Sequence, residues 1–185
     1  LSNEMAVYLH TLPRDVWRYA DRYPSACEEW NMADVVAHLI QEAITSTLSI
    51  QRSLQGNTSA PIGYQPLTKV EHTLHVSGLR EAYDEELFLE FNVTCKRLNI
   101  LLSSLRPAEY DIDAWQTERV GPLSLLIEDR LIELGIHGWD IRYGLERTAK
   151  LSPIAVPLLR DWVRGWYLKA FKGGDPLEKP VTYRF

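Results

Sequence analysis

Four side chains able to bind a metal or move a proton recur at helical spacing between residues 126 and 145. They share one face of a helix of about 3.6 residues per turn, and they are Asp129, Glu133, His137 and Asp140. Apolar residues flank this face on both sides, so the pattern predicts that the polar row points into the protein. Buried carboxylates and imidazoles are costly unless they are paired, hydrogen-bonded or bound to a metal. The row therefore predicts a partner for these side chains.

Two kinds of partner fit this row. Glu133 and His137 stand one turn apart, at positions i and i+4, a spacing that lets two helical side chains bind one ion. Asp140, one turn further on, could orient a metal ligand through a hydrogen bond. The alternative is a row of buried salt bridges, in which Arg130 pairs with a carboxylate and His137 is a hydrogen-bonded core histidine. The spacing alone leaves both readings open.

The opposite strip of the same helix contains Glu128, Gly135, Gly138 and Arg142. Because it lacks large apolar side chains, we expect it to face water.

A second helix is predicted from about Met32 to Gln55, with Asn31 as its N-cap and Asp34 as the reciprocal acidic partner. His38 projects from a side of this helix other than its main apolar face. The polar side chains near it on that side are Glu42, Thr45 and Ser49. His38 is therefore either solvated or part of the lining of a wet cleft between helices.

Apolar periodicity predicts three further helices: 4–19, kinked or started by Pro13, then 81–105, and finally 153–171 with Val156, Leu159 and Val163 facing inward. The segment 111–120 is predicted as a connector and 56–67 as a long loop that could form a lid or a pocket wall. These elements predict an all-α fold, a four-helix bundle with an additional helix.

The C-terminal end of the chain alternates apolar and polar residues in a strand-like pattern from Pro180 to Phe185. We therefore expect a helical bundle over 1–174, and a tail or the start of a further domain over 175–185.

His72 and His75 lie three residues apart at the start of a helical stretch, and we expect them on the surface or in a first helical turn. Cys27 and Cys95 have no flanking base, so both are predicted to be structural thiols. Two cysteines in a chain of 185 residues suit a reducing cytoplasm better than a disulfide scaffold.

The overall composition excludes several classes of function. A net charge of −5 argues against nucleic acid, which requires a basic surface. No apolar run approaches roughly 18 residues, so we expect no membrane span, and no secretory signal is recognisable.

Two motifs together resemble a known family. The segment 30–39, with Trp30, Asp34 and His38, matches the pattern W-x(3)-D-V-x-x-H-L, and 133–140 matches E-L-x-x-H-x-W-D. Both are similar to the mycothiol-dependent maleylpyruvate isomerase family, within the DinB-like superfamily of metal-binding four-helix bundles. The resemblance covers about residues 4–172.

The resemblance implies a divalent ion, usually zinc, held by His38, Glu133 and His137, with Asp140 hydrogen-bonded to a ligand. Three such ligands leave an open position, where a small-molecule thiol would be deprotonated. The expected function is thus S-transfer or cis–trans isomerisation of a small substrate with a mycothiol-like thiol. A homodimer is compatible with such bundles.

Two other functions are consistent with the same residues. One is a non-catalytic binding or dimerisation module stabilised by the polar row. The other is a metal-dependent hydrolase, in which Glu42 or Asp129 would be the base that activates water.

Overall fold

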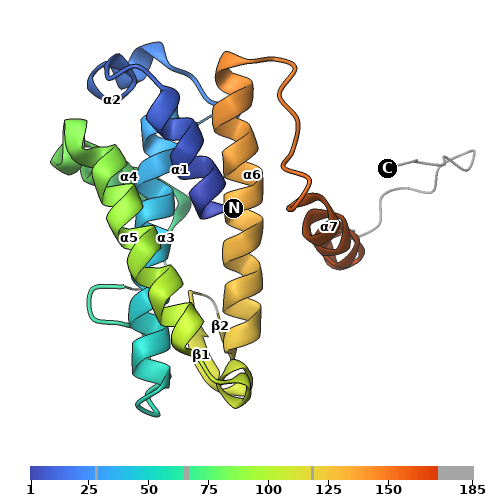
Figure 1. The fold of residues 1–185 in the computed structure, drawn as a ribbon. Helices are drawn as coiled ribbons and strands as arrows, with labels where there is room; N and C mark the ends of the chain where they lie inside the picture. Colours follow the sequence, from blue (N-terminus) through green and yellow to red (C-terminus); the bar gives the residue numbers. More distant parts are fainter. Residues whose placement is uncertain (28, 65–66, 118, 171–185) are drawn as a thin grey trace, which may run out of the picture.

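The computed structural model describes residues 1–27, 29–64, 67–117 and 119–170 and confirms the predicted all-α fold (Figure 1). Its helices and strands are α1 (Ser2–Thr11), α2 (Asp15–Arg18), α3 (Met32–Ser53), α4 (Lys69–Tyr83), α5 (Leu87–Ser104), β1 (Asp113–Gln116), β2 (Arg119–Pro122), α6 (Leu123–Leu145) and α7 (Val156–Ala170). Short 3-10 helices cover Ala20–Arg22, Asp84–Glu86 and Pro107–Asp111. None of the helices described is both long and apolar enough to cross a membrane.

Four helices form a closed ring in which each contacts its two neighbours, in the order α1, α5, α3 and α6. This is the arrangement of a four-helix bundle. Helix α4 covers α3 and α5, whereas α7 contacts α6 (Figure 1). The central position of α3 explains its burial, since most of its side chains are inaccessible to water.

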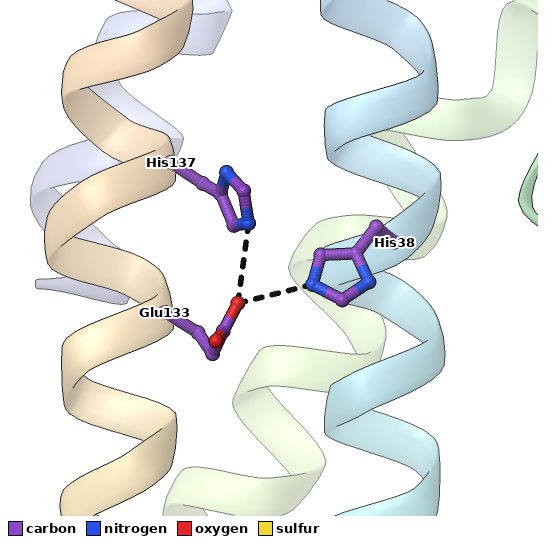
Figure 2. Close-up of side chains that lie close together, drawn as sticks. All are labelled: His38, Glu133 and His137. Carbon is purple, nitrogen blue, oxygen red and sulfur yellow. Dashed lines mark hydrogen bonds and ion pairs between the residues drawn. The ribbon is translucent and has the colours of Figure 1, made fainter. Parts of the chain in front are cut away.

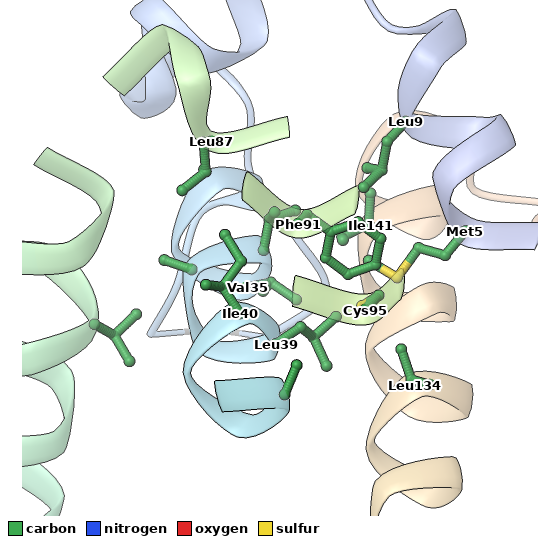
Figure 3. Close-up of a cluster of buried hydrophobic side chains, with 14 of the residues drawn as sticks. Met5, Leu9, Val35, Leu39, Ile40, Leu87, Phe91, Cys95, Leu134 and Ile141 are labelled. Atoms are coloured by element: carbon green, nitrogen blue, oxygen red, sulfur yellow. The ribbon is translucent and has the colours of Figure 1, made fainter. Parts of the chain in front are cut away.

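Large apolar side chains from α1, α3, α5 and α6 meet in the interior of the ring (Figure 3). Leu39 of α3, Phe91 of α5 and Ile141 of α6 are each completely or almost completely buried. Burying one such side chain contributes about 1.5–3 kcal/mol to the free energy of folding. The core therefore fixes α3 and α6 side by side, which is what the functional site requires.

The predicted N-terminal cap of α3 is confirmed. Asn31 Oδ1 accepts a hydrogen bond from the backbone N–H of Asp34 at 2.9 Å, and Asp34 Oδ2 accepts one from the N–H of Asn31 at 3.2 Å. Arg80 of α4 lies 2.9 Å from the other carboxylate oxygen of Asp34. One acidic side chain thus starts α3 and ties it to α4.

Two of the predicted helices are interrupted. The predicted helix 4–19 ends at Thr11 and resumes as the short α2, because Pro13 cannot continue the hydrogen-bond ladder. The predicted helix 81–105 is divided at Asp84, whose φ of 44° is incompatible with an α-helix. Residues 81–83 therefore belong to α4, Asp84–Glu86 form a 3-10 helix, and α5 begins at Leu87.

The predicted connector 111–120 contains an antiparallel hairpin of β1 and β2, in which Trp115 is paired with Val120. The Ser49 hydroxyl of α3 donates a hydrogen bond to the carbonyl of Trp115. This bond fixes the hairpin against the end of α3, so the hairpin can form one wall of a site between α3 and α6.

The prediction that one strip of α6 faces water is partly wrong, because Gly135 and Gly138 in this strip are buried. A Cβ on Gly135 would approach the Cβ of Ala155 to 2.9 Å. Because glycine has no side chain, the segment that leads into α7 can pack closely against α6 at this position.

Helix α7 begins three residues later than predicted, at Val156. Leu159 is buried as predicted, whereas Val156 and Val163 are 46% and 36% exposed. The predicted tail, 175–185, lies outside the described residues.

Candidate metal centre

His38, Glu133 and His137 converge from two helices (Figure 2). One oxygen of Glu133, Oε2, lies 3.1 Å from Nε2 of His38 and 3.1 Å from Nε2 of His137. One ligand atom from each residue lies within 4.8 Å of the other two. The structure thus brings together the three residues that the resemblance implied as metal ligands.

The two helices supply this geometry in different ways. Glu133 and His137 share a face of α6 because they are one turn apart. His38 comes from the second turn of α3, 95 positions earlier than Glu133. No local spacing could place it there; the packing of α3 against α6 does so.

Asp140 lies behind His137, where it was predicted. Its Oδ2 is 2.8 Å from Nδ1 of His137, on the opposite side of the ring from Glu133. The carboxylate therefore fixes the ring orientation and leaves Nε2 directed toward Glu133. Burial lowers the pKa of His137, but Asp140 and Glu133 outweigh it and raise this pKa to about 9.

The pKa of Glu133 is affected in the opposite sense. Burial alone would raise it, but hydrogen bonds to His137 and His38 lower this pKa well below its usual range. Glu133 is consequently an anion near neutral pH, as a metal ligand must be.

Aromatic rings enclose the histidine pair. The Trp30 ring lies 4.9 Å from the His38 ring and 6.1 Å from the His137 ring, measured between centroids. His72, in the first turn of α4, is half-buried and its ring lies 5.3 Å from that of His38. The sequence predicted no place for His72 at the site, because nothing near it in the chain indicates that α4 packs there. His75 is exposed, as predicted.

A cavity of about 410 Å³ opens beside His38 and Glu133. Its polar lining from α3 is the predicted set His38, Glu42, Thr45 and Ser49, joined by Ser46. The hairpin, Trp162 of α7 and the face of α6 that carries Asp129, Arg130 and Glu133 complete the walls. The sequence left His38 either in solvent or in a cleft between helices, and in the structure it lines the cleft. The described residues of the loop 56–67 do not line it.

Glu42 and Asp129, the two candidate bases, both line this cavity. Burial raises the pKa of each carboxyl group above its ordinary value. For Asp129, an ion pair with Arg119 at 3.0 Å opposes this effect. The cavity therefore holds two acids that retain a proton more readily than they would in water.

Neither cysteine belongs to the cluster of possible metal ligands formed by His38, Glu133 and His137. Cys95 is buried, Cys27 is half-buried, and burial raises the pKa of both thiols. A raised pKa disfavours the reactive thiolate, which agrees with their prediction as structural thiols.

Arg130 does not form the salt bridge that the alternative reading required. Its Nη2 lies 3.5 Å from Cys95 Sγ, and within the described parts of the chain no carboxylate lies within 4.0 Å of its guanidinium. Of that alternative, the Arg130 pair is thus not found among the described residues, whereas His137 is hydrogen-bonded to both Glu133 and Asp140.

Comparisons with known proteins identify a family and a similar fold. The model of the family described as "Mycothiol maleylpyruvate isomerase N-terminal domain" matches residues 9–142. The chain is also similar to a solved structure, the "Crystal structure of the mycothiol-dependent maleylpyruvate isomerase", with a TM-score of 0.63 and 15% identity. The match covers 76% of this chain and 55% of the other, so the chain spans little more than half the length of that protein. A comparison with curated proteins found no match.

Proposed function

Because the chain belongs to the family of mycothiol maleylpyruvate isomerase N-terminal domains, we propose that it is a metal-dependent enzyme that uses a small-molecule thiol. The proposed ligands are His38, Glu133 and His137, and the proposed ion is zinc. The proposed reaction is cis–trans isomerisation of a small substrate, or S-transfer to it. The observation that carries the proposal is the convergence of these three side chains at the wall of a polar cavity.

The donor set fits a catalytic ion better than a structural one. Two imidazole nitrogens and one carboxylate oxygen are ligands typical of zinc enzymes, which keep a further position open. When bound there, zinc supplies an open position at which a thiol is held deprotonated near neutral pH. The half-exposed Glu133 and the adjacent cavity leave room for a ligand on that side.

The protein's own residues prepare this position. Asp140 holds the His137 ring with Nε2 directed at the site. Trp30 and His72 pack against the His38 ring and limit its rotation. The hairpin and Trp162 of α7 line the cavity, and such walls reduce access of bulk water to the reacting groups.

Metal binding is tested by elemental analysis of protein purified without a metal-affinity step. We expect about one zinc ion per chain in the wild type, as in other three-ligand sites, and none in His137→Ala. The exposed His75→Ala is the matched control and should retain the ion. An ion retained in His137→Ala with unchanged affinity would contradict the proposed ligand set.

The use of a thiol is tested on cobalt-substituted protein. Addition of mycothiol should produce a sulfur-to-cobalt charge-transfer absorption in the wild type, with saturable dependence on thiol concentration. A metal-loaded protein whose spectrum is unchanged by the thiol would contradict the thiol-dependent function while leaving the metal site intact.

A further inference from the structure

His38 and His137, the two histidines proposed as metal ligands, are supported unequally. Nδ1 of His137 lies 2.8 Å from Asp140, whereas Nδ1 of His38 is inaccessible to water and has no hydrogen-bond partner among the described residues. This nitrogen lies on the side of the ring away from Glu133, which faces Nε2 at 3.1 Å (Figure 2). One buried nitrogen of the proposed ligand set therefore lacks a partner.

The use of Nε2 decides what Nδ1 of His38 must do. A neutral imidazole has one N–H group, and a ring nitrogen that binds a metal ion cannot carry it. If Nε2 of His38 faces an ion, the proton must therefore reside on Nδ1. A buried N–H group without an acceptor is unfavourable, so His38 is a strong ligand only if an acceptor meets this proton.

His72 of α4 is the neighbouring ring that can accept this hydrogen bond. Its centroid lies 5.3 Å from that of His38, and the two rings are nearly perpendicular, at 83°. At this separation, rotation of the His72 ring can bring a nitrogen of each ring within hydrogen-bond distance of the other. Trp30 lies beside both rings, but its indole nitrogen can only donate, and that N–H group also lacks a partner among the described residues.

The first turn of α4 holds the backbone of His72 in place. Thr68 and Glu71 form a capping box, in which each side chain accepts a hydrogen bond from the backbone N–H of the other residue. The backbone N–H of His72 donates to the carbonyl of Thr68 at 2.9 Å. Lys69 lies 2.6 Å from Glu29 and connects this turn to the segment that precedes α3. Only the ring of His72 therefore needs to turn.

The surroundings of His72 keep one of its nitrogens able to accept. Burial lowers the pKa of His72, and the nearby His38 and His75 lower it further. The ring is therefore neutral near neutral pH, and a neutral imidazole has one acceptor nitrogen. Unlike the Asp140 carboxylate, this acceptor adds no negative charge to the site.

We propose that His72 is a positioning residue for His38, whose Nδ1–H group it accepts when an ion occupies the site. The two histidine ligands are then held by different partners, a carboxylate for His137 and an imidazole for His38. Because His72 belongs to α4, the proposed site depends on a third helix besides α3 and α6. This inference rests on the proposed metal site, but it can fail while that site stands.

Zinc affinity, measured by competition with a chelator, tests this role in His72→Phe. Phenylalanine keeps an aromatic ring beside His38 but offers no acceptor. We expect zinc affinity to fall by about tenfold, the lower end of the usual effect of losing such a partner. The Tm of the metal-free variant should equal or exceed that of the wild type, which would show that packing is retained.

Two further variants separate the acceptor from the helix that carries it. His72→Gln restores an acceptor and should bind zinc more tightly than His72→Phe. His75→Phe is the matched control, because His75 is exposed on the same helix, and its zinc affinity should equal that of the wild type.

Nitrogen–proton NMR spectra of the zinc-loaded protein report on the hydrogen bond itself. The Nδ1 proton of His38 should resonate downfield in the wild type and move upfield in His72→Phe, because a hydrogen bond deshields its proton. The indole proton of Trp30 should move less. A larger change at Trp30 than at His38 would show that His72 accepts from Trp30 instead, and would overturn the proposal.

The possible failures are distinguishable. Equal zinc affinity of the wild type and His72→Phe, or equal affinity of His72→Gln and His72→Phe, would overturn the role of His72 while leaving the proposed metal site intact. Wild-type protein that binds no zinc would contradict the proposed function and this inference together. Weakened zinc binding in His72→Phe alone, with an upfield shift of the His38 proton, would support the proposal.

Discussion

We expect Asp140 to influence the proposed binding of a metal by His137, because the two are hydrogen-bonded through the nitrogen that faces away from Glu133. Asp140→Asn removes the negative charge and weakens the control of ring orientation. We expect zinc affinity to fall by about 10–100-fold, the usual effect of losing such a partner. A competition titration against a chelator measures the change. Asp129→Asn, which alters a half-exposed carboxylate on the same helix, should leave zinc affinity nearly unchanged.

The raised pKa of His137 predicts a pH dependence for the metal-free protein. Its folded pKa of about 9 exceeds the ordinary value of 6.5. The protonated histidine therefore stabilises the fold fully below about pH 6.5, and this contribution is lost as the pH rises through 9. Urea unfolding of the apoprotein should show a free energy of unfolding that decreases across this interval.

His137→Ala should lack this decrease, and a similar slope in that variant would contradict the assignment. Protonation of His137 also opposes zinc binding, because the ligand nitrogen must lose its proton before it binds an ion. Zinc affinity of the wild type should therefore rise over the pH interval in which apoprotein stability declines.

At the level of single residues, sequence patterns predicted the part of the candidate site that lies on one helix. The spacing of Glu133, His137 and Asp140 was sufficient for that purpose. The helical pattern alone allowed His38 to be either exposed to solvent or part of a cleft between helices, and the family resemblance favoured the cleft. His72 was not predicted, because its contact with His38 depends on how α4 packs, and the lack of a partner for Nδ1 of His38 among the described residues became apparent only with the structure.

Two glycines of α6 allow a test of how tightly this helix is packed. A Cβ at Gly144 would overlap the backbone carbonyl of Pro24, which cannot move aside as a flexible side chain can. Gly144→Ala should therefore destabilise the protein by about 1–3 kcal/mol through overpacking. Urea unfolding measures the difference from the wild type.

Gly138→Ala is the control on the same helix, because a Cβ there would meet no atom within 4 Å. Alanine has the higher helix propensity, so this variant should be more stable than the wild type by about 0.5–1 kcal/mol. If both variants lost stability equally, the difference in packing at the two glycines would be contradicted.

The elements were predicted well where the local signals were strong. The capping pair Asn31 and Asp34 and the apolar periodicity located α3 and α6 closely. The break at Asp84 was missed because apolar periodicity continues across it. The hairpin was missed because its four-residue strands carry too few residues for a clear alternation. Burial of Gly135 was missed because it depends on the position of Ala155, which follows α6 in the chain.

For the molecule as a whole, zinc should act as a link between α3 and α6. An ion that binds the folded chain but not the unfolded one stabilises it by mass action, by about 2.7 kcal/mol at a free concentration of 100 times Kd. Urea unfolding at increasing zinc concentrations should follow this dependence. His75→Ala should behave as the wild type does, and a similar stabilisation of His137→Ala would show that zinc acts elsewhere.

The separation of 95 positions between His38 and Glu133 also determines when the site can exist during synthesis. A ribosome makes α3 and its histidine first, and α6 follows only after α4, α5 and the hairpin. A nascent chain that ends before residue 133 carries one of the three proposed ligands and cannot complete the site. Binding of the proposed ion would consequently be a late event, which would follow the collapse of the bundle and could not guide its early steps.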